Sequence, residues 1–165
     1  MPTRPIWSAL SIASCIVVAC ISVSAVAEAA GPAWNGRYSV VTYASQKTGS
    51  SGAARQPEFD FSAQFDFVTD CSSGRCIATA NGPAPSNPTI PRPQQYGWDG
   101  SRWLSVYTWQ WECYRGETLP KEYAPARSQV FYAPSDGSLF GTWQTEILSG
   151  ACRGTVVMPV VAYPA

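Results

Sequence analysis

The chain has 165 residues, with 11 basic and 11 acidic side chains and no histidine, so its formal net charge at pH 7 is zero. This balance argues against a basic surface for nucleic acid. The missing histidine excludes Ser–His–Asp and Cys–His catalytic sites and histidine metal ligands. The length favours one domain behind any targeting segment.

Residues 1–27 have the features of a secretory signal peptide. Arg4 supplies a positive start, residues 6–26 are almost all apolar or small, and Ala25-Val26-Ala27 is a small-x-small cleavage site. We therefore expect residues 28–165 to form one mature β domain that is secreted, extracellular or held in the cell envelope.

Two other interpretations of the leader stay open. The apolar run is long enough to span a bilayer, so an uncleaved anchor is one alternative. Val17-Val18-Ala19-Cys20 is similar to a bacterial lipobox, so lipidation of Cys20 is the other. The residues after Cys20 stay apolar, whereas a mature lipoprotein normally turns polar there.

Four cysteines follow the leader: Cys71, Cys76, Cys113 and Cys152. An even number of cysteines behind a signal peptide predicts two disulfides. Of the three possible pairings we favour Cys71–Cys76 across a tight turn and Cys113–Cys152 between distant strands. A four-thiolate zinc site is the alternative, but an exported protein meets an oxidising environment first.

No stretch shows a helical stripe of ten or more residues, and turn pairs such as Asn35-Gly36 separate short alternating runs. A first strand is predicted at residues 36–44, followed by a mobile surface loop at residues 46–57, which are rich in Ser, Gly and Ala. The next run places five residues on one face, which we expect to be buried: Phe59, Phe61, Ala63, Phe65 and Phe67. Residues 71–76 turn the chain and residues 77–80 return it.

Residues 81–94 contain five prolines. This density excludes a helix and a central strand, because proline lacks the backbone donor that both need. One interpretation is a rigid connector packed on one end of a barrel. The other is a lip or lid over a pocket.

The central hairpin is the strongest feature of the sequence, because Asp99-Gly100 lies between two aromatic runs. After this turn a strand of about eleven residues is predicted, and one of its faces carries Trp103, Ser105, Tyr107, Trp109, Trp111 and Cys113. Such aromatic side chains most often fill a barrel core. They also stack on sugar rings or form the wall around an apolar ligand.

Further along, residues 115–127 are expected to form an irregular charged connection. Strands are predicted at residues 128–133, 139–148 and 154–162, the last with both faces buried or closing the sheet. Eight strands in meander order predict an all-β fold, an antiparallel up-and-down barrel of lipocalin- or avidin-like shape, because closure removes exposed edges. A two-sheet β-sandwich is the alternative.

Carboxylates on strands or strand ends are the remaining catalytic option, and a facing pair would suit glycoside hydrolysis. They are Asp60, Asp66, Asp70, Asp99, Glu112 and Glu146. The stronger interpretation is that they are solvated, so we predict no catalytic residue, metal site or cofactor. The candidate ligand-binding residues are Trp103, Tyr107, Trp109, Trp111 and Trp143.

Several motifs, taken together, resemble a family of small exported mycobacterial proteins with no assigned activity. They are Trp34-x-Gly36-x-Tyr38, Lys47-Thr48-Gly49, Cys71-Ser72-x-Gly74-Arg75-Cys76, Gly82-Pro83-x-Pro85-x-Asn87-Pro88, Trp109-Gln110-Trp111-x-Cys113 and Ser149-Gly150-Ala151-Cys152. More loosely, the Cys-x-x-Gly-x-Cys turn and the stretch from Pro134 to Gly141 resemble extracellular domains of mycobacterial receptor Ser/Thr kinases. Both resemblances imply a secreted or envelope protein, and neither supplies catalytic residues.

We therefore expect a non-enzymatic binding or surface module whose partner is an apolar or glycan ligand or an envelope component, and not nucleic acid. A carboxylate-based glycan hydrolase and a purely structural or antigenic surface protein are the alternatives. A cavity lined by Trp and Tyr would favour binding, and a dry core would favour the structural protein. Two carboxylates about 5–10 Å apart in an open cleft would favour the hydrolase.

Overall fold

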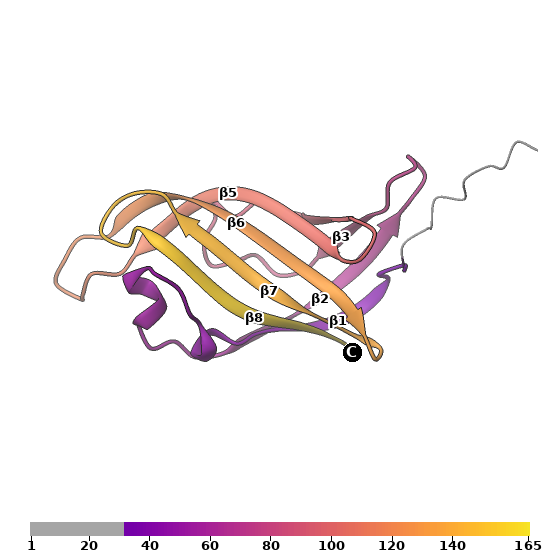
Figure 1. Ribbon diagram of the computed structural model, residues 1–165, viewed down its shortest axis with the longest axis horizontal. Helices are drawn as coiled ribbons and strands as arrows, with labels where there is room; N and C mark the ends of the chain where they lie inside the picture. Colours follow the sequence, from indigo (N-terminus) through magenta and orange to yellow (C-terminus); the bar gives the residue numbers. More distant parts are fainter. Residues whose placement is uncertain (1–31) are drawn as a thin grey trace, which may run out of the picture.

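The computed structural model describes residues 32–165, which form eight strands and two short 3₁₀ helices (Figure 1). The predicted cleavage site after Ala27 and the lipidation candidate Cys20 lie outside the described residues. The strands are β1 (Gly36–Thr42), β2 (Phe61–Asp70), β3 (Ile77–Asn81), β4 (Gln94–Trp98), β5 (Trp103–Cys113), β6 (Glu122–Ser135), β7 (Ser138–Ile147) and β8 (Gly154–Pro164), and the helices are η1 (Ala44–Gln46) and η2 (Gly52–Arg55). None of the helices within residues 32–165 has the length and apolar character needed to cross a bilayer.

The strands close into an antiparallel barrel in chain order, and β8 pairs with β1. Val40 of β1, for example, lies opposite Ala63 of β2 on one side and Ala162 of β8 on the other. This confirms the predicted up-and-down barrel and excludes the two-sheet sandwich.

The two halves of the barrel wall have unequal lengths. β3 and β4 have five residues each, whereas β5 to β8 have 10 to 14 and extend further toward one end (Figure 1). β4 pairs with β5 only at Gly97–Leu104 and Trp98–Trp103, and its remaining residues follow β3. Beyond Leu104, therefore, this edge of β5 is not covered by β4.

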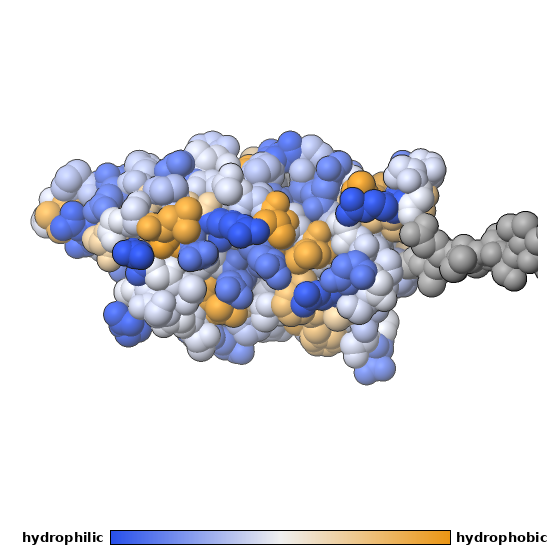
Figure 2. Space-filling view, turned by 45° about the horizontal axis from the view of Figure 1, so that its top comes forward, coloured by the Kyte–Doolittle hydropathy of each residue, from blue (hydrophilic) through white to orange (hydrophobic). Residues whose placement is uncertain are grey.

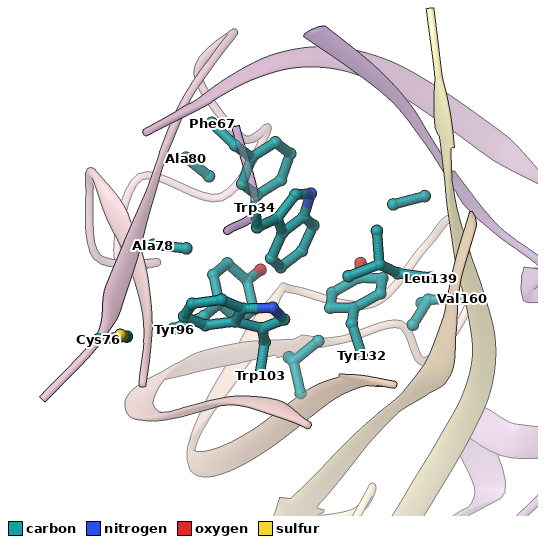
Figure 3. Packing of buried hydrophobic residues seen from close by; sticks show 12 residues of the cluster. Trp34, Phe67, Cys76, Ala78, Ala80, Tyr96, Trp103, Tyr132, Leu139 and Val160 are labelled. Carbon is teal, nitrogen blue, oxygen red and sulfur yellow. The ribbon is translucent and has the colours of Figure 1, made fainter. Parts of the chain in front are cut away.

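One end of the barrel is closed by an aromatic cluster around Trp34, which we call the Trp34 plug (Figure 3). Trp34 precedes β1, and its side chain is 1% exposed. Its backbone is tied to Thr69 of β2, whose hydroxyl accepts from Trp34 N and donates to Trp34 O, each at 2.9 Å. These two bonds fold the chain start inward, so that the indole packs against Phe67, Tyr96, Trp103 and Tyr132.

A second apolar cluster lies at the other end, where η1 and η2 pack against β8. The prediction of a mobile loop at residues 46–57 was wrong for this reason. Ser51 is fully buried, its hydroxyl donates to Cys152 O at 2.6 Å, and Thr48 forms a β-bridge with Val157. At Gly49 a Cβ would collide with the backbone of Thr155, so the small residues of this segment permit close packing rather than mobility.

Both favoured disulfides are present, Cys71–Cys76 and Cys113–Cys152, with Cα atoms 4.0 and 5.8 Å apart. The first closes the turn between β2 and β3. The second joins the end of β5 to the loop before β8 and is buried in the second cluster.

Two details of the predicted strands were wrong. Phe59 lies before β2 and is 93% exposed, so the buried face begins later. β6 begins at Glu122, inside the expected irregular connection, with Ala124 and Ala126 pointing inward. Alanine and Pro125 have weak strand preference, which explains why the sequence pattern did not show this extension.

Candidate ligand-binding site

A cavity of about 690 Å³ occupies the barrel interior beside the Trp34 plug. Its walls reach Thr42 at the end of β1, Phe61 at the start of β2 and the segment that connects β3 to β4. These three features share the barrel end opposite Trp34. The barrel is therefore filled with side chains around Trp34, and the cavity lies toward the other end, next to the second apolar cluster.

The wall is mainly apolar. Alternate residues of β2 contribute four neighbouring positions, Phe61, Ala63, Phe65 and Phe67, so the predicted inward face of this strand is confirmed from Phe61 onward. The remaining strand residues of the wall are Val40, Thr42, Ala80, Asn81, Gln94, Tyr96, Tyr107, Val130, Tyr132 and Trp143.

The proline-rich segment, residues 82–93, forms one side of the cavity. Arg92 Nη2 donates to Gly82 O at 2.7 Å and so ties the two ends of the segment together. Asn87 Nδ2 donates to Gln110 O at 2.8 Å, and Gln110 N donates to Thr89 Oγ1 at 3.0 Å. The segment is thus a connector fixed to the free edge of β5, and it also forms a lip over the cavity. Both interpretations of the sequence therefore apply to it.

Of the five predicted ligand-binding residues, Tyr107 and Trp143 line the cavity. Trp103 is fully buried in the plug, with its ring centroid 6.1 Å from that of Trp34. Trp109 and Trp111 face inward and pack on each other, with their ring centroids 5.3 Å apart, but they do not line the cavity. The structure therefore brings two of the five together at the cavity, and ligand binding by any of them stays a prediction.

Phe65, Tyr96 and Tyr132 also line the cavity, although none of them was predicted to be a site residue. The alternation of β2 did place Phe65 on the inward face. A core side chain and a cavity-wall side chain share the same period of two, so sequence pattern alone cannot separate them.

Ser128 organises a buried polar group next to the cavity wall. Its Oγ accepts from the indole nitrogens of Trp109 at 2.8 Å and Trp143 at 3.1 Å, and it lies 2.7 Å from Thr145 Oγ1. A serine hydroxyl can accept two hydrogen bonds and donate one. Because both acceptor positions of Ser128 are occupied by the indoles, we infer that its hydroxyl donates to Thr145 Oγ1. This group fixes the orientation of the Trp143 ring that faces the cavity.

The candidate carboxylates lie on the outer surface, away from this cavity, whose one charged lining residue is Arg92. The guanidinium of Arg37 lowers the pKa of Asp66, and Lys121 lowers the pKa of Glu112. A hydrolase needs a general acid with a raised pKa that faces a second carboxylate. The pKa values of Asp66 and Glu112 are lowered instead. Within residues 32–165, moreover, no cluster of three His, Cys, Asp or Glu side chains could hold a metal ion.

The outer face of the long strands has a mixed character. In the view of Figure 2, apolar side chains form separate groups among hydrophilic ones. Val106 of β5 and Phe140 of β7 are exposed apolar side chains of this kind. This is the expected pattern for strands that bury every second residue, so the cavity is the stronger candidate site.

Comparison with known proteins supports the fold. No protein-family model and no curated protein sequence matches the chain. Among solved structures, the barrel is similar to the monomer form of the M. tuberculosis PknI sensor domain, with a TM-score of 0.59 and 19% identity over 82% of this chain and 90% of that chain. The match agrees with the looser of the two resemblances in the sequence, that to receptor domains, and does not support the one to small exported proteins.

Proposed function

We propose that this protein is an exported, non-enzymatic binding module that holds a small apolar molecule in the barrel cavity. The observation that carries the proposal is the 690 Å³ cavity with its apolar and aromatic wall. Ligand sites in proteins have volumes of roughly 300–1,000 Å³. An eight-stranded barrel is just wide enough either to be filled by side chains or to hold one ligand, and here the side chains of the two clusters leave a cavity beside the Trp34 plug.

The wall favours an apolar ligand over a glycan. A sugar needs many hydrogen bonds, and beyond the prolines and aromatic rings the cavity offers only a few polar side chains at its rim, among them Thr42, Asn81 and Gln94. The Trp109–Trp111 pair, the strongest stacking surface in the sequence, lies outside the cavity.

Export is supported by the two disulfides, because such bonds persist in oxidising compartments. The structural neighbour is a sensor domain, which fits a role in binding rather than catalysis. On this proposal the mature chain begins near Glu28. N-terminal sequencing of protein recovered from the culture medium tests it, and a diacylated Cys20 would show a lipoprotein instead.

Fluorescence titration with N-phenyl-naphthylamine, a neutral apolar dye, tests the binding function. We expect the dye to bind the purified protein and to change the emission of Trp143, which lies in the cavity wall. Ala63→Leu extends a side chain into the cavity and should weaken binding several-fold. Gln64→Leu, at the next residue of β2 and on its exposed face, is the matched control and should leave binding unchanged.

Two results would overturn this proposal. One is a wild-type protein that does not bind the dye, and the other is equal binding by the Ala63→Leu and Gln64→Leu variants. Either result would favour a purely structural surface protein. Native mass spectrometry of the protein from its own medium would, in addition, reveal a ligand that co-purifies with the barrel.

A further inference from the structure

Three tyrosines from three adjacent strands meet in the wall of the cavity: Tyr96 of β4, Tyr107 of β5 and Tyr132 of β6. The side chains of Tyr96 and Tyr132 are 8% and 3% exposed, and their ring centroids lie 5.7 Å apart at an angle of 74°. Both rings also contact Trp34, at 5.3 and 5.1 Å between centroids. They therefore form the boundary between the plug and the cavity, which we call the cavity floor. Figure 3 shows both rings packed around Trp34.

The hydroxyl groups of Tyr96 and Tyr132 have no hydrogen-bond partner among residues 32–165. Buried tyrosine hydroxyls usually find one, because an unpaired buried hydroxyl is energetically costly. In the described part of the chain, the indole nitrogen of Trp34 is the single fully enclosed side-chain atom without a partner. The two phenol oxygens are thus not sealed in the packing, and both tyrosines line the cavity.

Burial raises the pKa of Tyr96, Tyr107 and Tyr132. A tyrosine is protonated at neutral pH even at its ordinary pKa of about 10, so each of these phenols can donate a hydrogen bond there. The charge that an ionised Tyr132 or Tyr107 would carry raises the pKa of Tyr96 further. Tyr107 is only partly buried, whereas Tyr96 and Tyr132 are buried, so Tyr96 and Tyr132 are the two enclosed donors of the floor.

We infer that the cavity floor recognises a neutral oxygen atom of the ligand, such as the carbonyl oxygen of a ketone or ester, through hydrogen bonds donated by Tyr96 and Tyr132. This inference rests on the proposed function and adds its polar specificity. An ionised carboxylate is a poor fit, because the floor offers no cation and desolvating that charge is costly. Arg92, the charged residue of the wall, belongs to the proline-rich segment at the rim and is engaged with Gly82 O.

Displacement of N-phenyl-naphthylamine by three matched ring compounds tests the inference: cyclooctanone, cyclooctane and cyclooctanecarboxylate. Tyr96→Phe and Tyr132→Phe each remove one hydroxyl and keep the ring, so the barrel stays folded. We expect each variant to bind cyclooctanone about fivefold to tenfold more weakly, the loss of about one hydrogen bond, and to bind cyclooctane as the wild type does. Tyr114→Phe, at an exposed tyrosine outside the cavity, is the control and should change neither affinity.

The possible failures are distinguishable. Unchanged cyclooctanone binding in both cavity variants overturns the inference and leaves the apolar binding function standing. Tighter binding of the carboxylate than of the ketone overturns the neutral-ligand assignment. Wild-type protein that binds neither the dye nor any of the rings overturns the proposed function itself. Circular dichroism of each variant confirms that the fold is retained.

Discussion

Trp34 and Phe67 stack face to face inside the barrel, with ring centroids 3.8 Å apart and ring planes inclined by 12°. One residue precedes the first strand and the other lies in the middle of β2, so the contact folds the chain start into the sheet. Aromatic ring pairs contribute about 0.5–1.5 kcal/mol beyond the area that they bury. The Trp34 plug is therefore the part of the barrel that we expect to dominate its stability.

Trp34→Ala should lower the free energy of unfolding by about 3–5 kcal/mol, because it removes one of the two largest fully buried side chains of the plug. Denaturation followed by tryptophan fluorescence measures this loss. Tyr114→Ala, at a side chain that is 58% exposed, should change stability by less than about 0.5 kcal/mol. Equal stability of the two variants would show that the plug does not hold the barrel together.

Trp109→Ala should lower the free energy of unfolding by about 3 kcal/mol. This is the low end of the range for a buried tryptophan, because Trp109 is only half-buried. The variant also removes one of the two indole donors to Ser128. Gln110→Ala should cost little, since Gln110 holds the proline-rich segment through its backbone. A folded Trp109→Ala variant of wild-type stability that binds the dye more weakly would move Trp109 from packing to ligand binding.

Strand β5 shows which features of the fold the sequence pattern can predict. Period-two alternation of large aromatics predicted the length and inward face of β5, because bulky side chains at every second residue leave little choice of face. The Trp34 plug was not predicted. It depends on the contact with Thr69, which is 35 residues away in the sequence, and no local pattern encodes such a contact.

The candidate site was predicted less completely for a different reason. Whether Phe65 packs on another side chain or faces empty space depends on the distance across the barrel, and strand periodicity carries no information about that distance. The proline-rich segment was correctly excluded from helix and sheet. Its attachment to the free edge of β5 follows from the early divergence of β4, which only the folded register reveals.

Removing the two disulfides separately should have unequal effects. A loop closed by residues 39 apart restricts the unfolded chain more than one closed by residues 5 apart. The loop-entropy model predicts that Cys113–Cys152 stabilises the folded state by about 4 kcal/mol and Cys71–Cys76 by about 2 kcal/mol. Paired Cys→Ser variants compared by thermal denaturation check this order, and a larger loss from the shorter bridge would contradict it.

The hairpin turn should lose stability in acid. The side chain of Arg102, together with backbone donors of the turn, lowers the pKa of Asp99 from 3.8 to about 2. A lowered folded-state pKa stabilises the protein above the unfolded value, and this contribution is lost as the pH falls from about 4 to about 2. Asp99→Asn should therefore be less stable than wild type at pH 6, and the gap should close near pH 2. A gap that stays constant with pH would exclude an ionic contribution.

Gly141→Ala should destabilise the barrel by about 1–3 kcal/mol or more, because its Cβ would collide with the backbone of Phe131 on β6. Gly97→Ala, also at a strand glycine, is the matched control. Its Cβ would meet only the end of the Arg75 side chain, at 3.9 Å, and should be tolerated. Urea denaturation of both variants measures the difference, and similar midpoints would show that β6 and β7 can separate without cost.

The plug and the cavity occupy different parts of the barrel, so the packing that stabilises the fold is separate from the space that could hold a ligand. We expect the plug to dominate stability, whereas much of the cavity wall belongs to a proline-rich segment outside the strand ladders. Substitutions in that segment can alter which molecule fits without disturbing the packing around Trp34. The same scaffold can therefore diversify its chemistry during evolution, or be redesigned for a new small molecule, while its folding remains unchanged.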